Sequence, residues 1–396
     1  MFKNISHAPE DAIFGVKKLF DASTIANKQI LSLGVYLSEQ GEQFVFPAVS
    51  KAEDRIIHKH DKNYLPMVGH PPLLKPSQEL LLGNVYNQVK DRLSSCQSVA
   101  GTGGVYMVAK FLKDFYPDTK KIILGTPSWP NYIPIFEGQR HQFITYDWTK
   151  NNQFNLNGAI ESIRSAPEKS LVIMQGCGHN PTGVDPSGEE WKEFLDAVDK
   201  KNDLMLFDFA YMGYASGDMD KDAEVIRQYS LRGRPFFVAF SFSKCMGLYG
   251  ERIGVLHTFC ENLKDAESVG SQMVSVGRQT YSVCPQNGAL IASEILNDPE
   301  LKKQWIGELR QCTNRLIDIR KEFCDKVEKL AGIDWTIIRK QKGMFTMPGF
   351  TQNQVKYLMD KKGVFLPMSG RIAITSLNHS NVDIVANAVA EALKNA

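Results

Sequence analysis

The chain has 396 residues, of which 43% are hydrophobic and 23% charged, with 46 Lys and Arg against 44 Asp and Glu. This length exceeds what one hydrophobic core usually organises and indicates two domains. The near-neutral charge, without a basic block interleaved with aromatic residues, argues against a nucleic-acid-binding protein, and no apolar run is long enough to span a bilayer.

The N-terminal segment 1–20 contains acidic residues and no apolar core followed by a small-residue cleavage site, so we expect neither a secretory nor a mitochondrial presequence. The seven cysteines are odd in number, form no C-x-x-C pair and stand mostly in apolar segments, as reduced thiols do. These features predict a cytoplasmic protein. The eight histidines show no metal-ligand spacing, so we expect no metal site.

Segments between about residues 100 and 260 alternate between strand-like and helical patterns. Runs that are nearly continuous in apolar residues are typical of strands buried on both faces: KKIILGT (120–126), SLVIMQG (170–176), LMLFDFA (204–210), FFVAFSF (236–242) and RIGVLHTF (252–259). Stretches with apolar residues three and four apart alternate with them, at 103–116 and 189–201. This alternation predicts an α/β fold whose large domain has a mostly parallel, doubly wound sheet.

Past residue 299 the pattern changes to one long amphipathic helical stretch, 299–330, followed by short strands and a final helix from about Asn381. We interpret this segment as a smaller α+β domain that the N-terminal arm completes. The predicted division is 1–44 for the arm and part of the small domain, 45–310 for the large domain and 311–396 for the small C-terminal domain.

Three features could carry chemistry at the carboxyl ends of the strands, where α/β sheets bind ligands. Gly101, Thr102 and the glycines after them precede a helix, so their backbone amides could face a phosphate, although such clusters also make tight turns. Asp208 follows an apolar strand and could either form a buried ion pair or bind a protonated ring nitrogen. Lys244 follows another strand, where a partly desolvated amine could form an imine with an aldehyde or simply a salt bridge.

SFSKCMGLYGERIG (241–254) resembles the cofactor-lysine segment of the aspartate aminotransferases, which share the large pyridoxal-phosphate aminotransferase fold. Other similar segments follow in family order and cover nearly the whole chain: YLPMVG (64–69), AGTGG (100–104), PSWPNYIPIF (127–136), GHNPTGVDP (178–186), FDFAYMGYASG (207–217), GRQTYS (277–282), KGMF (342–345) and SGRIAI (369–374). A colinear set of this length is a specific signal, whereas any one motif could arise by chance.

The resemblance implies that the large domain binds pyridoxal 5'-phosphate, with Lys244 linked to its aldehyde and later acting as the base that moves a proton. It implies that Asp208 keeps the pyridine nitrogen protonated, that Asn180 and Tyr211 bind the ring oxygen, and that Trp129 stacks on the ring. The residues that it assigns to the phosphate are Gly101, Thr102, Ser241, Ser243, Arg252 and, from a second subunit, Tyr64.

The resemblance also implies that the substrate is a dicarboxylic amino acid. Arg371 would bind its α-carboxylate and Arg278 of a neighbouring subunit its distal carboxylate, with Gly34, Trp129 and Asn180 lining the substrate site. The predicted protein is a homodimer with shared active sites that exchanges amino groups between aspartate or glutamate and oxaloacetate or 2-oxoglutarate.

Three alternatives stay open at this point. They are a broader aminotransferase that also acts on aromatic amino acids, a lyase or decarboxylase on the same fold, and a cofactor-binding protein without turnover, against which the presence of Lys244 argues.

Several positions depart from the pattern of the family. Tyr36 stands in place of a glycine in a loop near the substrate entrance, and Ala100 in place of a serine before the glycine cluster. Gln175 and Tyr132 stand where histidines are usual near Asp208, so the tuning of the ring charge could differ. The remaining departures are Gly250, in place of an asparagine, and Val283-Cys284-Pro285, in place of Asn-Pro-Pro.

Overall fold

The structure is a computed structural model that describes residues 2–8, 13–59, 61–117 and 119–395. The chain divides into two compact units: a large unit, Phe44–Asn314, and a small unit made of Met1–Gln43 and Arg315–Ala396. Within these described ranges no helix is both long enough and apolar enough to span a membrane.

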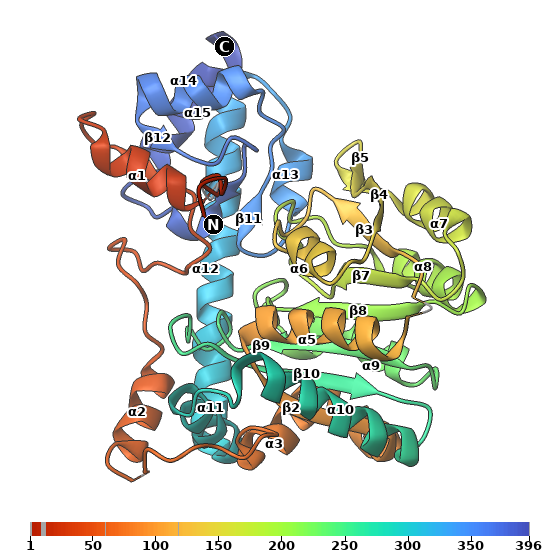
Figure 1. Ribbon diagram of the computed structural model, residues 1–396. Helices are drawn as coiled ribbons and strands as arrows, with labels where there is room; N and C mark the ends of the chain where they lie inside the picture. Colours follow the sequence, from red (N-terminus) through yellow and green to blue (C-terminus); the bar gives the residue numbers. More distant parts are fainter. Residues whose placement is uncertain (1, 9–12, 60, 118, 396) are drawn as a thin grey trace. The chain divides into compact units, whose positions relative to one another are not determined.

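A seven-stranded sheet forms the centre of the large unit, in the order β2-β10-β9-β8-β7-β3-β4 (Figure 1). The strands are β2 (Leu93–Val99), β3 (Ile122–Thr126), β4 (Phe143–Asp147), β7 (Leu171–Gln175), β8 (Leu204–Phe209), β9 (Phe236–Ser241) and β10 (Ile253–Phe259). Only β10 runs antiparallel to its neighbours in this sheet, β2 and β9. The prediction of an α/β fold with a mostly parallel sheet is therefore confirmed.

The five apolar runs seen in the sequence are the strands β3, β7, β8, β9 and β10. Every residue of β7, β9 and β10 is buried, which explains why these strands are apolar at almost every position. The strands β2 and β4 lie at the edges of the sheet and were not predicted. Their sequences, LSSCQSV and FITYD, carry several polar residues. Part of each strand is only partly buried, and the buried Gln97 and Ser98 of β2 donate hydrogen bonds to the carbonyls of Pro285 and Ala100.

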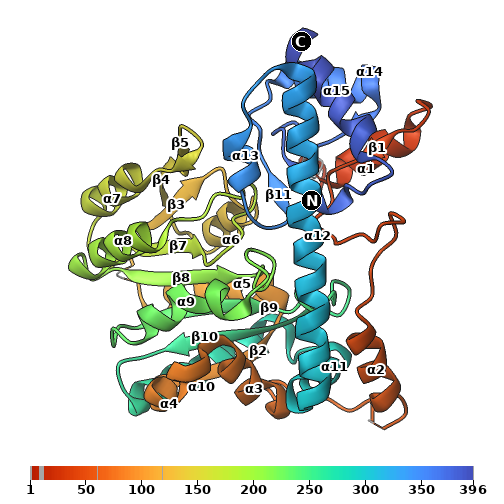
Figure 2. The ribbon, with the colours of Figure 1, turned by 180° about the vertical axis from the view of Figure 1, so that it is seen from behind.

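Helices cover both faces of this sheet. Helices α5 and α10 pack together on one face, and α8 and α9 lie on the other (Figures 1 and 2). The helices of the large unit are α2 (Pro47–Ile56), α3 (Pro71–Leu82), α4 (Tyr86–Val89), α5 (Ala100–Phe115), α6 (Tyr132–Gly138), α7 (Leu156–Ser165), α8 (Gly188–Lys200), α9 (Met219–Ser230), α10 (Leu263–Tyr281) and α11 (Asn287–Asn297), with the 3-10 turns η1 (Gly83–Val85) and η2 (Lys90–Arg92). A short hairpin of β5 (Thr149–Lys150) and β6 (Gln153–Phe154) completes it.

The helix α8 illustrates how the local sequence sets these elements. Ser187 and Glu190 form a capping box, in which each side chain binds the other residue's backbone amide, and this satisfies two amides of the first turn. Trp191, Phe194 and Val198 then follow at helical spacing and are all buried. The helix therefore begins at its cap and turns one apolar face toward the core.

The small unit contains two short two-stranded sheets and several helices. Its strands are β1 (Gln29–Ile30), paired in parallel with β12 (Val364–Phe365), and β11 (Phe345–Thr346), paired antiparallel with β13 (Ile372–Ala373). Its helices are α1 (Phe14–Ala22), α13 (Thr336–Lys340), α14 (Gln352–Lys362) and α15 (Val382–Asn395), with the 3-10 turn η3 (Ile374–Ser376). Helix α12 (Pro299–Ala331) begins in the large unit and ends in the small one.

Candidate functional site

The carboxyl ends of several parallel strands bring polar residues together in the large unit. Asp208, near the end of β8, is in register with Gln175 on β7 and with Ala239 on β9. β9 ends two residues farther on, at Ser241. A ligand at this edge of the sheet would meet side chains from strands far apart in the sequence, as in other doubly wound folds.

The two carboxylate oxygens of Asp208 differ in their surroundings. The Tyr132 hydroxyl donates a hydrogen bond of 2.6 Å to Oδ2. Oδ1 is buried and has no hydrogen-bond partner among the residues that the structure describes. Burial raises the pKa of Asp208 above its ordinary value, while the hydrogen bond from Tyr132 and the nearby charge of Lys244 oppose the rise. A buried carboxylate oxygen of this kind calls for a donor that the chain itself does not supply.

Lys244 lies in the loop after β9, and its Nζ atom is 5.1 Å from the centroid of the Tyr211 ring. Two hydrogen bonds fix the backbone of this loop. The Gly247 amide donates to the Lys244 carbonyl at 3.0 Å, and the indole of the fully buried Trp305 donates to the Cys245 carbonyl at 2.6 Å. The flexible lysine side chain thus extends from a backbone that is held in place.

Asn180 and Tyr211 form the next part of the site. The Asn180 side-chain amide donates to the Tyr211 hydroxyl at 3.2 Å, and both residues are buried. The Gln175 side chain forms two hydrogen bonds with the backbone of Asn180: it accepts from the backbone N–H at 2.8 Å and donates to the carbonyl at 2.9 Å. A neutral side chain therefore orients Asn180, at a position where the family resemblance led us to expect a histidine.

The amino end of helix α5 faces the same strand ends. A Cβ atom added to Gly101 would come within 3.3 Å of Ser241 Cβ and 3.7 Å of Asp208 Oδ1, so any side chain there would fill the space beside both residues. The Ser243 amide donates to Ser241 Oγ at 3.2 Å, and Arg252 contacts Ser243 Oγ at 3.5 Å. This arrangement joins a helix terminus, hydroxyl groups and a guanidinium, which together suit a phosphate.

These features fit pyridoxal 5'-phosphate, the cofactor implied by the sequence. The lone buried oxygen of Asp208 matches a protonated ring nitrogen, Lys244 matches an aldehyde, and the cradle at Gly101 matches a phosphate group. Trp129 lies beside this set, with its ring centroid 5.1 Å from that of Tyr132 in an edge-to-face arrangement.

Two residues predicted to serve the site are exposed at the surface of the chain. Tyr64 is 85% exposed, and Arg278, in the last turn of α10, is also exposed and donates to the hydroxyl of Ser282. Both were predicted to act in the site of a second subunit, and within one chain the structure leaves them at the surface. Their roles stay predictions.

Arg371 and Gly34 lie together in the small unit. Arg371 is only 4% exposed, donates to the Ser32 carbonyl at 2.5 Å and stacks its guanidinium 4.1 Å from the centroid of the Phe345 ring. A Cβ atom on Gly34 would come within 2.8 Å of the same ring, so a glycine lets Phe345 occupy this place. The ring and the carbonyl together orient the guanidinium.

Tyr36 lies close by in sequence but faces another partner. It is 5% exposed, and its ring centroid is 5.1 Å from the guanidinium carbon of Arg315. Arg315 in turn pairs with Glu39 and donates to the Leu37 carbonyl at 3.1 Å. Tyr36 therefore packs against the arginine that anchors its own loop.

Sequence motifs pointed to Tyr132, Gln175 and Phe345 without assigning them a role. Tyr132 and Gln175 were singled out as departures from the family, and Phe345 ends the KGMF segment. The sequence did not predict that the Ser32 carbonyl binds Arg371, because any residue type can supply a backbone acceptor.

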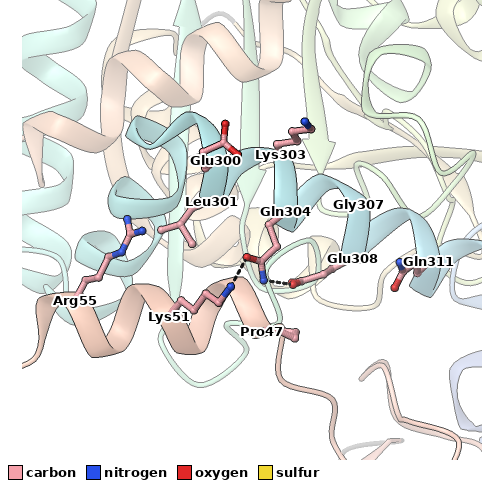
Figure 3. A pocket seen from close by; sticks show the side chains of 10 residues that line it. All are labelled: Pro47, Lys51, Arg55, Glu300, Leu301, Lys303, Gln304, Gly307, Glu308 and Gln311. Carbon is pink, nitrogen blue, oxygen red and sulfur yellow. Dashed lines mark hydrogen bonds between the residues drawn. The ribbon is translucent and has the colours of Figure 1, made fainter.

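A surface pocket of about 690 Å³ lies elsewhere, between α2 and the beginning of α12 (Figure 3). Lys51 donates across it to Gln304 at 2.8 Å, and Gln304 donates to Glu308 at 2.6 Å. None of the predicted site residues lines this pocket. Across the described part of the chain, no group of three or more His, Cys, Asp or Glu residues could hold a metal ion.

Comparisons with known proteins agree with the sequence resemblance. The profile of the family described as "Aminotransferase class I and II" matches residues 26–389. The mitochondrial aspartate aminotransferase of Gallus gallus is 37% identical over 398 residues, covering 99% of this chain and 94% of its own length. The cytoplasmic aspartate aminotransferase of Saccharomyces cerevisiae is 36% identical over 408 residues, covering 100% and 97%.

Solved structures give the same result. That of the yeast cytoplasmic enzyme superposes with a TM-score of 0.95 over 100% of this chain and 98% of its own. An aromatic-amino-acid aminotransferase from Burkholderia pseudomallei, covalently bound to pyridoxal phosphate, is 31% identical and superposes with a TM-score of 0.96 over 99% of both chains.

Proposed function

The chain belongs to the aminotransferase class I and II family, and from this we propose that it moves an amino group between aspartate or glutamate and oxaloacetate or 2-oxoglutarate. Its cofactor is pyridoxal 5'-phosphate. The observation that supports this function most directly is the buried, unpartnered Oδ1 of Asp208, which lies in the same cluster as Lys244 and the amino end of α5.

When bound, the cofactor supplies an aldehyde that takes up the amino group and a ring that accepts electron density from the substrate α-carbon. Asp208 would hold a proton on the ring nitrogen, because its buried carboxylate is already in place and desolvated. Lys244 Nζ would bind the aldehyde of the cofactor, and as a free amine it would move a proton at the substrate α-carbon. Asn180 and Tyr211, already paired with each other, orient the ring through its oxygen.

The remaining residues hold the cofactor and the substrate. Gly101 and Thr102 would bind the phosphate through backbone amides, together with Ser241, Ser243 and Arg252, and Trp129 would pack against the ring.

Arg371 binds the α-carboxylate through a guanidinium that Phe345 and the Ser32 carbonyl already orient, beside Gly34. A preoriented guanidinium loses little freedom when a carboxylate binds.

We propose further that the enzyme is a homodimer in which Tyr64 and Arg278 reach into the partner's site. Tyr64 is 85% exposed within one chain, which is unusual for a large aromatic side chain, and Arg278 is exposed on the last turn of α10. A second copy of the chain would cover both. Arg278 then supplies the preference for a second carboxylate.

A panel of amino donors, each assayed with 2-oxoglutarate, tests the function. We expect aspartate to be converted to oxaloacetate, with glutamate formed in equal amount. Release of product without any 2-oxo acid would instead indicate a lyase or decarboxylase. A panel without dicarboxylate turnover would refute the proposal.

A second candidate is a broader aminotransferase that also acts on aromatic amino acids. The likeness to the Burkholderia pseudomallei enzyme, named as an aromatic-amino-acid aminotransferase, favours it. Phenylalanine and tyrosine in the same panel decide between the two, through the ratio of their kcat/KM values to that of aspartate.

We also propose that the protein acts in the cytoplasm. All seven cysteines are buried thiols, as expected in a reducing compartment, and one relative is the cytoplasmic enzyme of yeast. The relative from Gallus gallus is mitochondrial, so fractionation of cells that express the tagged protein is the deciding measurement.

A further inference from the structure

The contact between Tyr132 and Asp208 joins two elements that are distant in the sequence. Tyr132 is the first residue of α6, and Asp208 lies near the end of β8. The 2.6 Å bond between the Tyr132 hydroxyl and Asp208 Oδ2 is the only side-chain hydrogen bond to this carboxylate among the residues that the structure describes. The orientation of the Asp208 carboxylate therefore depends on the hydroxyl of Tyr132.

The phenol has little freedom to move. Tyr132 is 1% exposed, and Trp129 packs edge-to-face against its ring at 5.1 Å. Burial, with the charge of Asp208 adding to it, raises the pKa of Tyr132 well above its ordinary value. The hydroxyl consequently keeps its proton and donates a hydrogen bond to Asp208.

We propose that Tyr132 is a positioning residue for the reaction: it fixes Asp208 through Oδ2, favours the ionised carboxylate and leaves Oδ1 to bind the cofactor's ring nitrogen. This inference rests on the proposed function. Its physical basis is that a hydrogen bond to a charged acceptor stabilises the charged form. With the bond in place, the shared proton resides on the ring nitrogen. Without it, the carboxyl group of Asp208 becomes the more basic site and takes the proton.

A purely structural role would give a different result. If Tyr132 only filled space between α6 and the sheet, the substitution Tyr132→Phe would change stability or cofactor retention and leave the position of the shared proton unaltered. The proton's position is therefore the measurement that separates the two roles, and it does not depend on turnover.

The experiment compares the holoenzymes of wild type, Tyr132→Phe and Tyr146→Phe, each loaded with pyridoxal 5'-phosphate labelled with ¹⁵N in the ring. Tyr146 is a matched control, because it is also buried and its hydroxyl bonds only weakly to the Met174 sulfur, at 3.7 Å. We expect the ¹⁵N signal of Tyr132→Phe to move toward that of the unprotonated ring and the signal of Tyr146→Phe to stay in place.

Turnover gives a second readout. Loss of a hydrogen bond to a charged group should lower kcat of Tyr132→Phe about 10- to 100-fold, with KM for aspartate within about threefold of wild type. The substitution leaves the proposed substrate-binding residues Arg371 and Arg278 unchanged, so we expect it to lower kcat and to leave KM nearly unchanged.

A second variant, which changes only the strength of the hydrogen bond from residue 132, keeps the test decisive if Tyr132→Phe fails to fold. Replacing Tyr132 by 3-fluorotyrosine makes the phenol a stronger donor and should move the ¹⁵N signal further toward the protonated ring. Unchanged ¹⁵N signals in both Tyr132 variants would overturn the inference. If wild type is inactive on every donor, the proposed function fails instead, and the ¹⁵N comparison still reports on Tyr132.

Discussion

Replacing Asp208 by asparagine tests the electrostatic core of the site. Asparagine keeps the size of the side chain and an oxygen that can accept from the Tyr132 hydroxyl, so the bond of 2.6 Å can persist. What is lost is the negative charge at Oδ1, the buried oxygen that has no partner in the described part of the chain. The substitution thus removes a charge and little else.

The structure sets the scale of the effect. Opposite charges at hydrogen-bond distance, about 3 Å, attract by about 5 kcal/mol at an effective dielectric constant of about 20. Removal of one preorganised electrostatic partner elsewhere costs about 3–4 kcal/mol, or about 10²- to 10³-fold in kcat. Because the carboxylate is desolvated, we expect Asp208→Asn to lose at least about 10²-fold in kcat.

The assay measures steady-state turnover of aspartate with 2-oxoglutarate, and cofactor retention after dialysis. Asp203→Asn is a matched control, since Asp203 directly precedes the same strand at its opposite end and also has one buried, unpartnered oxygen within the described ranges. We expect the control to keep wild-type kcat. Turnover by Asp208→Asn within about threefold of wild type would refute the electrostatic role, given the size of the effect estimated above.

Three further outcomes are expected. Borohydride should fix the cofactor to Lys244, and mass mapping of the adduct to another lysine would overturn that assignment. Mixing Lys244→Ala with Arg278→Asp under subunit exchange should restore aspartate turnover, because each heterodimer has one site with both residues intact; confirmed heterodimers without activity would show that Arg278 does not act across the interface. Burial raises the pKa of Asp203 to about 7, so the folded protein binds the proton more tightly than the unfolded chain and should lose stability as pH rises from about 4 to 7. Asp203→Asn should therefore raise the unfolding temperature more at pH 8 than at pH 5, and an equal change at both would contradict this origin of the shift.

Local patterns in the sequence were enough to predict the five inner strands of the sheet and the helices α5, α8 and α12. The runs that became β3, β7, β8, β9 and β10 are apolar because their residues are covered on both faces, and that requirement acts on each residue separately. The amphipathic stretch 299–330 became α12, Pro299–Ala331, for the same kind of reason. The edge strands β2 and β4 were not predicted, because some of their residues are partly exposed and the buried polar residues of β2, Gln97 and Ser98, are paired by hydrogen bonds.

The candidate site divides in the same way. The sequence by itself placed Asp208 and Lys244 after apolar strands and glycines before a helix, because each of these arrangements lies within a few consecutive residues. Only the tertiary structure decided which oxygen of Asp208 is bound by Tyr132 and which is left without a partner. It also decided that Phe345 and the Ser32 carbonyl orient Arg371, which follows them by many residues in the chain. Such contacts depend on the register of distant strands and on the positions of backbone atoms. The spacing of residues within a motif predicts neither.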